Sequence, residues 1–192
     1  MGKTSTFTTQ FRRRADGKTN YRKRESMVKS SIPRLVVRKS NNIVIAQIVQ
    51  FDPTGDRTLV HVNSNMLGQF GWKAGKKSLP AAYLTGLLAG VRAKKKKIDK
   101  AILDIGFATP VHGCSWAAAA KGAIDAGIAI NVGKEALPSE DRMQGRHIEQ
   151  FAKKLGDKAA KERFSAVSKA GVDMQNLTGL FASAKQKILG EK

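Results

Sequence analysis

The pattern of apolar and polar positions changes its period along the chain. Between residues 34 and 63, short runs rich in Val and Ile alternate with polar residues, which is typical of β-strands. These runs are RLVVRK at 34–39, NIVIAQIVQF at 42–51 and TLVHVN at 58–63. Ser40 and Asn41 suit a tight first turn, and DPTGDR at 52–57 has the composition of a second turn. The segment therefore predicts an antiparallel meander.

A helical period replaces this alternation after residue 78. Apolar residues recur every three or four positions over roughly 79–96, and Ser78 is placed to cap the first turn. The helix ends in four lysines at 94–97, whose charges oppose the negative end of the helix dipole. AILDIG at 101–106 follows as a nearly continuous apolar run, which predicts a strand buried on both faces.

The second half of the chain predicts further helices and one short strand. The expected elements are a helix from Ser115 to Ala126 stopped by Gly127, a strand near Ile128 to Asn131, a helix from Ser139 or Glu140 to about Leu155, and a helix near Asp173 to Leu189. A strand, a helix and a strand in succession imply a crossover that covers the sheet.

The predicted fold class is therefore α/β. We expect a single small domain with a mixed sheet, made of the antiparallel meander plus a crossover strand, and packed by helices. A length of 192 residues with 41% apolar composition suffices for one such core. The expected boundaries are a basic arm at 1–33, the α/β domain at 34–156 and a basic helical C-terminal extension at 157–192.

Charge changes the picture most strongly at the N-terminus. Residues 1–39 contain twelve Lys and Arg against Asp16 and Glu25, which gives +10 of the total net charge of +20. The stretch FRRRADGKTNYRKR at 11–24 is the centre of this excess. Because the arm has few large apolar residues and no sustained helical period before Pro33, we expect it to be mobile without a polyanionic partner.

RNA is the partner that this composition favours. The longest apolar run, LTGLLAGV at 84–91, is too short to span a bilayer, so no membrane partner is expected. The arm interleaves aromatic residues with arginines, which suits unstacked bases and irregular RNA. No motif that reads a DNA major groove is present. A second basic segment, GWKAGKKS at 71–78, offers Lys73 for phosphates and Trp72 for stacking, although Trp72 could equally anchor the loop to the core.

Alternatives to plain RNA binding rest on few residues. Asp104 lies in an apolar strand and could hold a metal ion in an RNA nuclease, but such chemistry usually needs further converging carboxylates, and no spacing here predicts them. Cys114 with His112 and His147 has no metal-ligand spacing, and a single cysteine excludes an intramolecular disulfide. A general RNA chaperone is the third possibility. No cofactor and no small-molecule substrate are expected.

Several motifs together resemble a known family. They are FRRRADGKTNYRKR, PRLVVRKSNNIVIAQIV, GDRTL, PAAYLTGLLAG at 80–90, LDIG at 103–106, AAAAKGAIDAG at 117–127 and PSEDRMQGRHI at 138–148. In this order they resemble the 5S-rRNA-binding protein of the large ribosomal subunit, the universal eighteenth family, in its archaeal and eukaryotic form, and most closely the archaeal version. The resemblance covers nearly the whole chain.

The resemblance implies a protein without enzymatic activity that resides with the ribosome in the cytoplasm. Its expected partners are 5S rRNA, large-subunit rRNA and neighbouring ribosomal proteins of the central protuberance. Residues 11–24 of this sequence match the RNA-binding arm of the family, and residues 38–41 match its first hairpin turn. Arg57, Trp72 and Lys73 are added to these as further basic or aromatic candidates. The predicted RNA-binding residues are Phe11, Arg12, Arg13, Arg14, Lys18, Thr19, Tyr21, Arg22, Lys23, Arg24, Arg38, Lys39, Ser40, Asn41, Arg57, Trp72 and Lys73.

Overall fold

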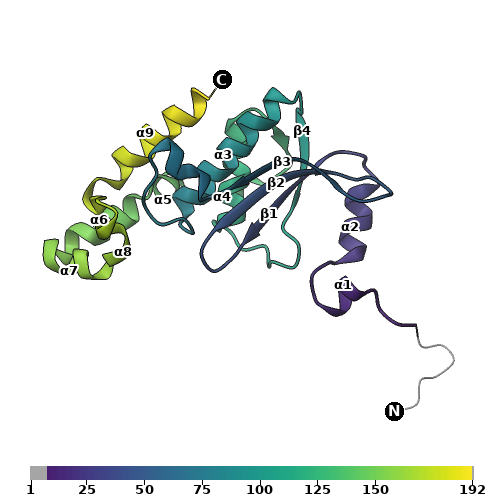
Figure 1. Ribbon diagram of the computed structural model, residues 1–192, viewed down its shortest axis with the longest axis horizontal. Coiled ribbons are helices and arrows are strands. Elements are labelled where there is room, and N and C mark those ends of the chain that lie inside the picture. The colour runs from purple at the N-terminus through teal and green to yellow at the C-terminus, as the bar shows by residue number, and fades with distance from the viewer. Residues whose placement is uncertain (1–7, 192) are drawn as a thin grey trace, which may run out of the picture.

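A five-stranded mixed sheet forms the centre of the protein (Figure 1). The computed structural model describes residues 8–191, apart from the side chains of residues 157, 158, 161, 166 and 169. The strands are β1 Arg34–Lys39, β2 Val44–Gln50, β3 Arg57–Asn63, β4 Lys100–Asp104 and β5 Ala129–Ile130, in the spatial order β3-β2-β1-β4-β5. β1 to β3 are antiparallel, whereas β4 pairs parallel with β1 and β5 pairs parallel with β4. The predicted meander and crossover strand are confirmed.

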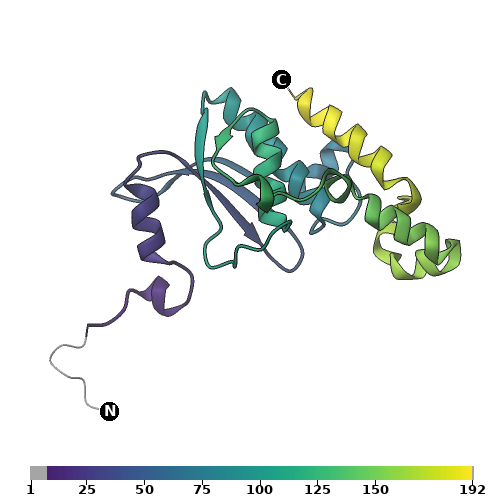
Figure 2. The same ribbon diagram turned by 180° about the vertical axis from the view of Figure 1, so that it is seen from behind.

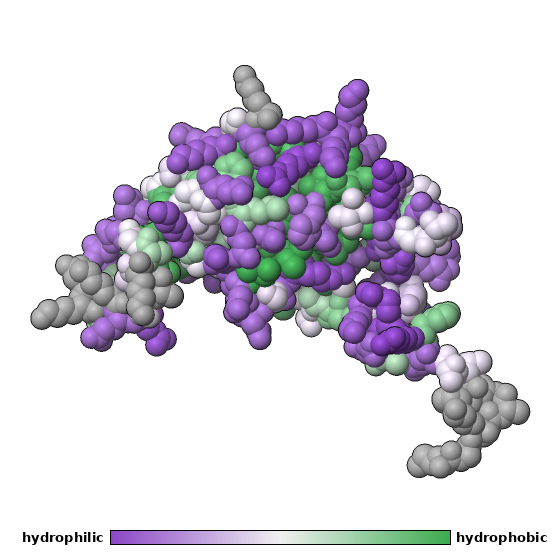
Figure 3. Space-filling model, viewed as in Figure 1, coloured by the Kyte–Doolittle hydropathy of each residue, from purple (hydrophilic) through white to green (hydrophobic). Residues whose placement is uncertain are grey.

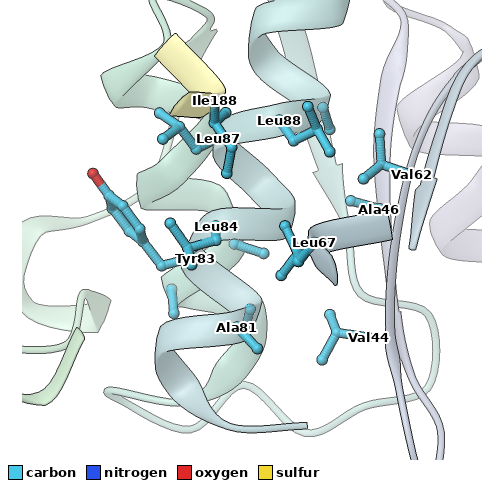
Figure 4. Close-up of a cluster of buried hydrophobic side chains, with 14 of the residues drawn as sticks. Val44, Ala46, Val62, Leu67, Ala81, Tyr83, Leu84, Leu87, Leu88 and Ile188 are labelled. Carbon is cyan, nitrogen blue, oxygen red and sulfur yellow. The ribbon is translucent and has the colours of Figure 1, made fainter. Parts of the chain in front are cut away.

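The two faces of the sheet differ because apolar side chains alternate along β1 and β2. Leu35 and Val37 are buried on the covered face of β1, and Val44 and Ala46 continue this face on β2. Figure 4 shows Val44, Ala46 and Val62 of the sheet facing the leucines of the neighbouring helix. The intervening positions of β1, which include Arg34, therefore lie on the opposite face.

Two helices cover the apolar face. They are α3 Leu79–Lys95 and α4 Ser115–Asp125, and Ser78 caps α3 by accepting a hydrogen bond from the N–H of Ala81 at 3.4 Å, as predicted. The two helices approach so closely that a Cβ atom at Gly86 would collide with the carbonyl oxygen of Ala119. The first glycine in PAAYLTGLLAG, Gly86, is thus explained by contact between helix backbones.

The expectation that β4 is buried on both faces is wrong, because helices cover only one face of the sheet. The apolar run at 101–106 predicts burial on both faces, yet Ile102 and Leu103 are only half-buried. Asp104 is buried at the end of the strand without any helix above it, because ion pairs rather than apolar packing enclose it. The apolar run reflects one covered face and one face occupied by charged groups.

The C-terminal part is helical. It contains α5 Glu140–Gln144, α6 Arg146–Leu155, α7 Asp157–Arg163, α8 Ser165–Lys169 and α9 Leu177–Leu189, and short 3₁₀ helices lie at Met66–Phe70, Lys134–Ala136 and Met174–Asn176. The single helix predicted to run to about Leu155 is wrong, because the chain breaks at Gly145, which has a left-handed φ of 84°.

The last helix belongs to the core. α9 packs along α3, where the rings of Phe181 and Tyr83 lie 5.5 Å apart and Ile188 is fully buried (Figure 2). The extension predicted over 157–192 therefore ends in a helix that completes the apolar core. None of the helices within residues 8–191 is both long and apolar enough to cross a bilayer.

The N-terminal arm contains helices that the sequence pattern does not predict. α1 spans Arg12–Ala15 and α2 spans Tyr21–Val28, although the sequence has no sustained helical period before Pro33. Asn20 caps α2 because its Oδ1 accepts from the N–H of Lys23 at 3.2 Å. Neither helix has a buried residue, so apolar periodicity gives no signal here. Residues 1–7 of the predicted arm lie outside the described residues.

Candidate RNA interface

The arm and the uncovered face of the sheet enclose a groove of about 600 Å³, called here the arm groove. Arm residues such as Lys18, Lys23 and Arg24 line one side, and Arg34 and Arg38 of β1 line the other. The groove brings together predicted residues as far apart in sequence as Arg13 and Arg38. Its lining is predominantly polar and basic, which suits a phosphate backbone.

A chain of ion pairs holds the arm against the sheet. Both terminal nitrogens of Arg24 donate to the carboxylate of Asp56 at 2.8 Å, and Nη2 of Arg34 donates to the same carboxylate at 2.6 Å. Nη1 of Arg34 donates to Asp104 at 3.1 Å, and Nη2 of Arg38 donates to Asp104 at 3.0 Å. We call Arg24, Asp56, Arg34, Asp104 and Arg38 the ion-pair chain. It fixes α2 relative to β1 and β4.

The end of β4 is built around Arg38. Its Nη1 donates to the carbonyl oxygens of Val37 at 2.9 Å and Asp104 at 2.6 Å. Gly106 has a left-handed φ of 66°, and a Cβ there would lie 2.9 Å from Cζ of Arg38. Glycine in LDIG therefore lets the chain turn beneath the guanidinium. The Arg38 side chain keeps 42% exposure and can still reach a ligand in the arm groove.

Asp104 has little capacity left for a metal ion. Its Oδ1 accepts from Arg38 and from the N–H of Gly106 at 2.8 Å, while Oδ2 accepts from Arg34. Within residues 8–191 no group of three or more His, Cys, Asp or Glu residues is arranged to hold a metal. His112 is also engaged, since its Nδ1 lies 2.9 Å from the carbonyl oxygen of Glu135. The carboxylate of Asp104 serves the ion-pair chain.

Most arm cations have no acidic partner. Of the described residues, none forms an ion pair with Arg12, Arg14, Arg22 or Lys23. These four side chains lie on exposed positions of α1 and α2 and are available for phosphate oxygens. Arg24 differs, because Asp56 occupies its guanidinium.

Three predicted residues, Arg13, Lys18 and Thr19, shape the turn between the arm helices. Nε of Arg13 donates to Oγ1 of Thr19 at 2.9 Å, and the carbonyl oxygen of Arg13 accepts from the N–H of Lys18 at 2.8 Å. Lys18 pairs with Asp16 at 3.2 Å, and both side chains are exposed. Thr19 therefore orients Arg13, and the exposed pair of Lys18 can be exchanged for a phosphate at little cost.

An aromatic pair lies beside these cations. Phe11 is 71% exposed, and its ring lies 5.1 Å from the ring of Tyr21 at an interplanar angle of 49°. The two rings together place aromatic surface next to the exposed arginines of the arm. The pair offers a face on which an unpaired base can stack.

The hairpin turn between β1 and β2 borders the same region. Oγ of Ser40 accepts from the N–H groups of Asn42 at 3.3 Å and Ile43 at 3.1 Å, which orders the turn. Lys39 and Asn41 are exposed at its tip. Lys39 and Lys18 line one depression together, so the structure brings the predicted hairpin residues next to the arm.

Three predicted residues, Trp72, Lys73 and Arg57, belong neither to the arm nor to the hairpin turn beside it, and none of them lines the arm groove. Trp72 is 2% exposed and packs in the core, so its assignment to RNA stacking is wrong and its other expected role, anchoring the loop, holds. Lys73 is exposed, but its loop borders α9 near Lys187, at the opposite end of the molecule from the arm (Figure 1). Arg57 is exposed on the other side of β3.

Sequence reasoning missed the residues that position the arm. Arg34, at 4% exposure, and Asp56 link the arm to the sheet, and Asn20 starts α2. The only sequence signal for Arg34 is a charged residue at the alternate position of an apolar strand. Asp56 lies in a turn whose composition already accounts for an aspartate.

The uncovered basic face, the exposed arm cations and the aromatic pair define an RNA-binding protein of the α/β class. Residues 5–100 match the family model described as ribosomal large subunit proteins 60S L5, and 50S L18. The large ribosomal subunit protein uL18 of Korarchaeum cryptofilum (strain OPF8) is 43% identical over 189 residues, which cover 98% of this chain and 97% of the relative. The chain belongs to this family of ribosomal large subunit proteins.

Membership confirms the family that the sequence motifs indicate. The protein is thus a structural component of the large ribosomal subunit, in an rRNA-binding and translation context, and resides in the ribosome in the cytoplasm. Proteins of this family are typically structural rather than enzymatic.

Proposed function

We propose that the protein binds 5S rRNA through the arm and the arm groove, and helps to attach it to large-subunit rRNA in the central protuberance. Neighbouring ribosomal proteins of that region are its further partners. On this proposal the chain acts by binding alone, without catalysis or a small-molecule substrate. The resemblance of the arm and of PAAYLTGLLAG to the 5S-rRNA-binding family supports the choice of RNA.

One observation carries the proposal. The ion-pair chain holds α2 beside the sheet while Arg12, Arg14, Arg22 and Lys23 stay exposed and unpaired among the described residues. A ligand that neutralises these cations must be long, negatively charged and able to follow a curved basic surface. RNA has these properties, and the exposed Phe11 supplies a face for a base.

The proposed contacts position the RNA more than they read its sequence, because Arg and Lys bind phosphates of any nucleotide. Specificity for one RNA then comes from shape, through a groove whose two sides are held at a fixed separation. If about six to ten cations contact phosphates, affinity falls by roughly 10³ to 10⁵ between 50 and 200 mM salt.

A competition titration tests the proposal. The full chain is titrated onto labelled 5S rRNA at near-physiological salt in the presence of excess tRNA. Retained binding to 5S rRNA supports shape recognition by the arm groove. Equal competition by tRNA contradicts the proposal and favours a general RNA chaperone.

Two variants assign the contacts. Arg22→Gln combined with Lys23→Gln is expected to lower the slope of log affinity against log salt by about two. The matched control, Lys154→Gln with Lys187→Gln, removes the same charge from the helices at the other end and is expected to leave the slope unchanged.

Asp104→Asn tests the nuclease alternative: it is expected to change stability only, and loss of an RNA-cleaving activity would support that alternative.

A further inference from the structure

A second basic surface lies where α3 ends and β4 begins. It consists of Arg57, Lys96, Lys97 and Lys100, which line a shallow depression of about 760 Å³, and we call it the α3-end surface. Figure 3 shows hydrophilic side chains gathered along this edge of the molecule. The depression does not share a residue with the arm groove. It is therefore a separate surface.

The start of β3 separates the two surfaces. Asp56 and Thr58 line the arm groove, whereas Arg57 and Leu59 line the α3-end surface. Successive residues of a strand point to opposite faces, so Arg57 is directed away from the arm. A ligand in the arm groove leaves Arg57 free for a second ligand.

The cations of this surface exceed what the helix end requires. One or two cations suffice to offset the helix dipole, and Lys94 already occupies Asp99 at 2.6 Å. Of the described residues, none forms an ion pair with Arg57, Lys97 or Lys100. Among the other acids, Asp52 is close enough to Arg57 for the guanidinium to help lower its pKa, after the stronger effect of its hydrogen bonds with Thr54. The surface keeps a net positive charge.

Lys97 occupies a position that favours glycine. Its φ is 60°, and the N–H of Ile98 donates to the carbonyl oxygen of Ala93 at 3.1 Å while the N–H of Lys97 donates to that of Lys94 at 2.9 Å. This is the hydrogen-bond pattern of a Schellman cap, in which the left-handed residue is usually glycine. A lysine there lowers stability relative to glycine, and a ligand for its charge would account for its presence.

The depression contains no aromatic side chain. Besides the four cations, its apolar lining is aliphatic and comprises Ile32, Pro33, Leu59 and Ile98. Single-stranded RNA is usually held by stacking on aromatic rings, whereas an RNA duplex is held through its phosphates. The chemistry therefore fits a duplex backbone.

We propose that the α3-end surface binds the phosphate backbone of a second RNA duplex while the arm groove is occupied. The inference rests on the proposed function, and it names the surface through which the bound 5S rRNA is joined to large-subunit rRNA. Lys97, Lys100 and Arg57 contact phosphates. Lys96 donates to the carbonyl oxygen of Leu59 and joins α3 to β3, so it supports the surface.

The experiment uses the full chain saturated with unlabelled 5S rRNA and titrates it with a labelled RNA duplex of about two helical turns. The variant carries Arg57→Gln, Lys97→Gln and Lys100→Gln, and the matched control carries Lys134→Gln, Lys154→Gln and Lys187→Gln. We expect the variant to lose duplex binding with a salt slope lower by about three, and the control to retain it. Equal binding by variant and control overturns the inference.

The same titration separates the two proposals. Both triple variants are first titrated on 5S rRNA alone, where each is expected to match the unmodified chain. If 5S rRNA does not bind at all, the proposed function fails. The α3-end surface is judged separately, by whether the variant loses duplex binding and the control retains it.

A single substitution gives an independent readout. Lys97→Gly is expected to raise the thermal midpoint, because glycine adopts a left-handed φ freely, and to weaken duplex binding at the same time. Unchanged duplex binding by Lys97→Gly overturns the role of Lys97. Because this substitution is expected to stabilise the fold, weaker binding by the variant cannot be attributed to unfolding.

Discussion

Nη2 of Arg34 lies 2.6 Å from Oδ2 of Asp56, and this contact joins β1 to the turn that precedes β3. The same carboxylate accepts both donors of Arg24, so one aspartate connects a buried arginine of the sheet to an arginine of the arm. The position of the arm therefore depends on Arg34, a buried residue of the sheet. The bidentate contact of Arg24 with Asp56 is directional, so it gives this junction a defined geometry.

Removal of the Arg34 guanidinium is expected to destabilise the protein. Arg34→Met leaves Asp104, which is 6% exposed, with only part of its compensation, and the free energy of unfolding should fall by about 3 kcal/mol. Urea denaturation followed by circular dichroism measures the loss. Arg38→Met is the control, since its side chain is 42% exposed and should cost less. Equal, small losses for both variants would contradict a structural role for Arg34.

Loss of the Asp56 charge is expected to free the arm. Asp56→Asn removes the acceptor that Arg24 and Arg34 share, so amide hydrogen exchange in α2 should become faster while exchange in α3 stays unchanged. Asp52→Asn is the matched control in the same turn, because the Asp52 side chain forms its hydrogen bonds with Thr54 and none with an arm residue among those described. Unaltered exchange in α2 would show that other contacts hold the arm.

A methyl group between α3 and α4 is expected to disrupt the core. In Gly86→Ala the new Cβ collides with the backbone of Ala119. To relieve the collision, α3 or α4 would have to shift on the sheet that both helices cover. The free energy of unfolding should fall by about 3 kcal/mol or more. Gly133→Ala is the control, because it has a negative φ of −60° and nothing within 4 Å of the added atom. Similar thermal midpoints for the two variants would refute the close approach.

Glu149 gives the protein a predictable response to acid. Hydrogen bonds from Lys153 and from Thr178 lower the pKa of Glu149 from 4.5 to about 2. A carboxylate with a lowered pKa stabilises the folded state above pH 4.5, and this contribution is lost as the pH falls through about 2. Glu149→Gln should therefore be less stable than the unmodified chain at pH 6, with a difference that shrinks between pH 4.5 and 2.

Thermal unfolding across this pH range measures the difference. Glu135→Gln is the control, because among the described residues its side chain forms no ion pair and lies exposed at the surface. A difference between Glu149→Gln and the unmodified chain that stays constant down to pH 2 would contradict the assignment.

The strands and the two covering helices were predictable because each has a strong local signal. The alternation in RLVVRK distinguishes Leu35 and Val37 from the residues of the other face, and Ser78 marks the start of α3 in the sequence itself. The break at Gly145 was not predictable, because apolar spacing continues across it from Met143 to Ile148. Gly145 has a left-handed φ of 84°, and a Cβ there would lie 2.8 Å from Cδ2 of Leu177, so only the tertiary structure explains the glycine.

The candidate site was predictable in its chemistry and only partly in its geometry. The exposed arm cations follow from composition, since a segment so rich in Arg and poor in apolar residues cannot be core. The wrong assignment of Trp72 follows from the ambiguity of an aromatic residue in a basic loop, where a core anchor and a stacking surface have the same sequence pattern.

By itself, the sequence determined the family, the sheet and its covering helices, and the basic character of the arm, because local periodicity and charge are carried by neighbouring residues. Only the tertiary structure decided that Arg24, Asp56, Arg34, Asp104 and Arg38 form one ion-pair chain. Arg34 and Asp104 are 70 positions apart, and such a pairing depends on which strands become neighbours. Buried charges must find partners across the sheet, and no local pattern records which partner each one meets.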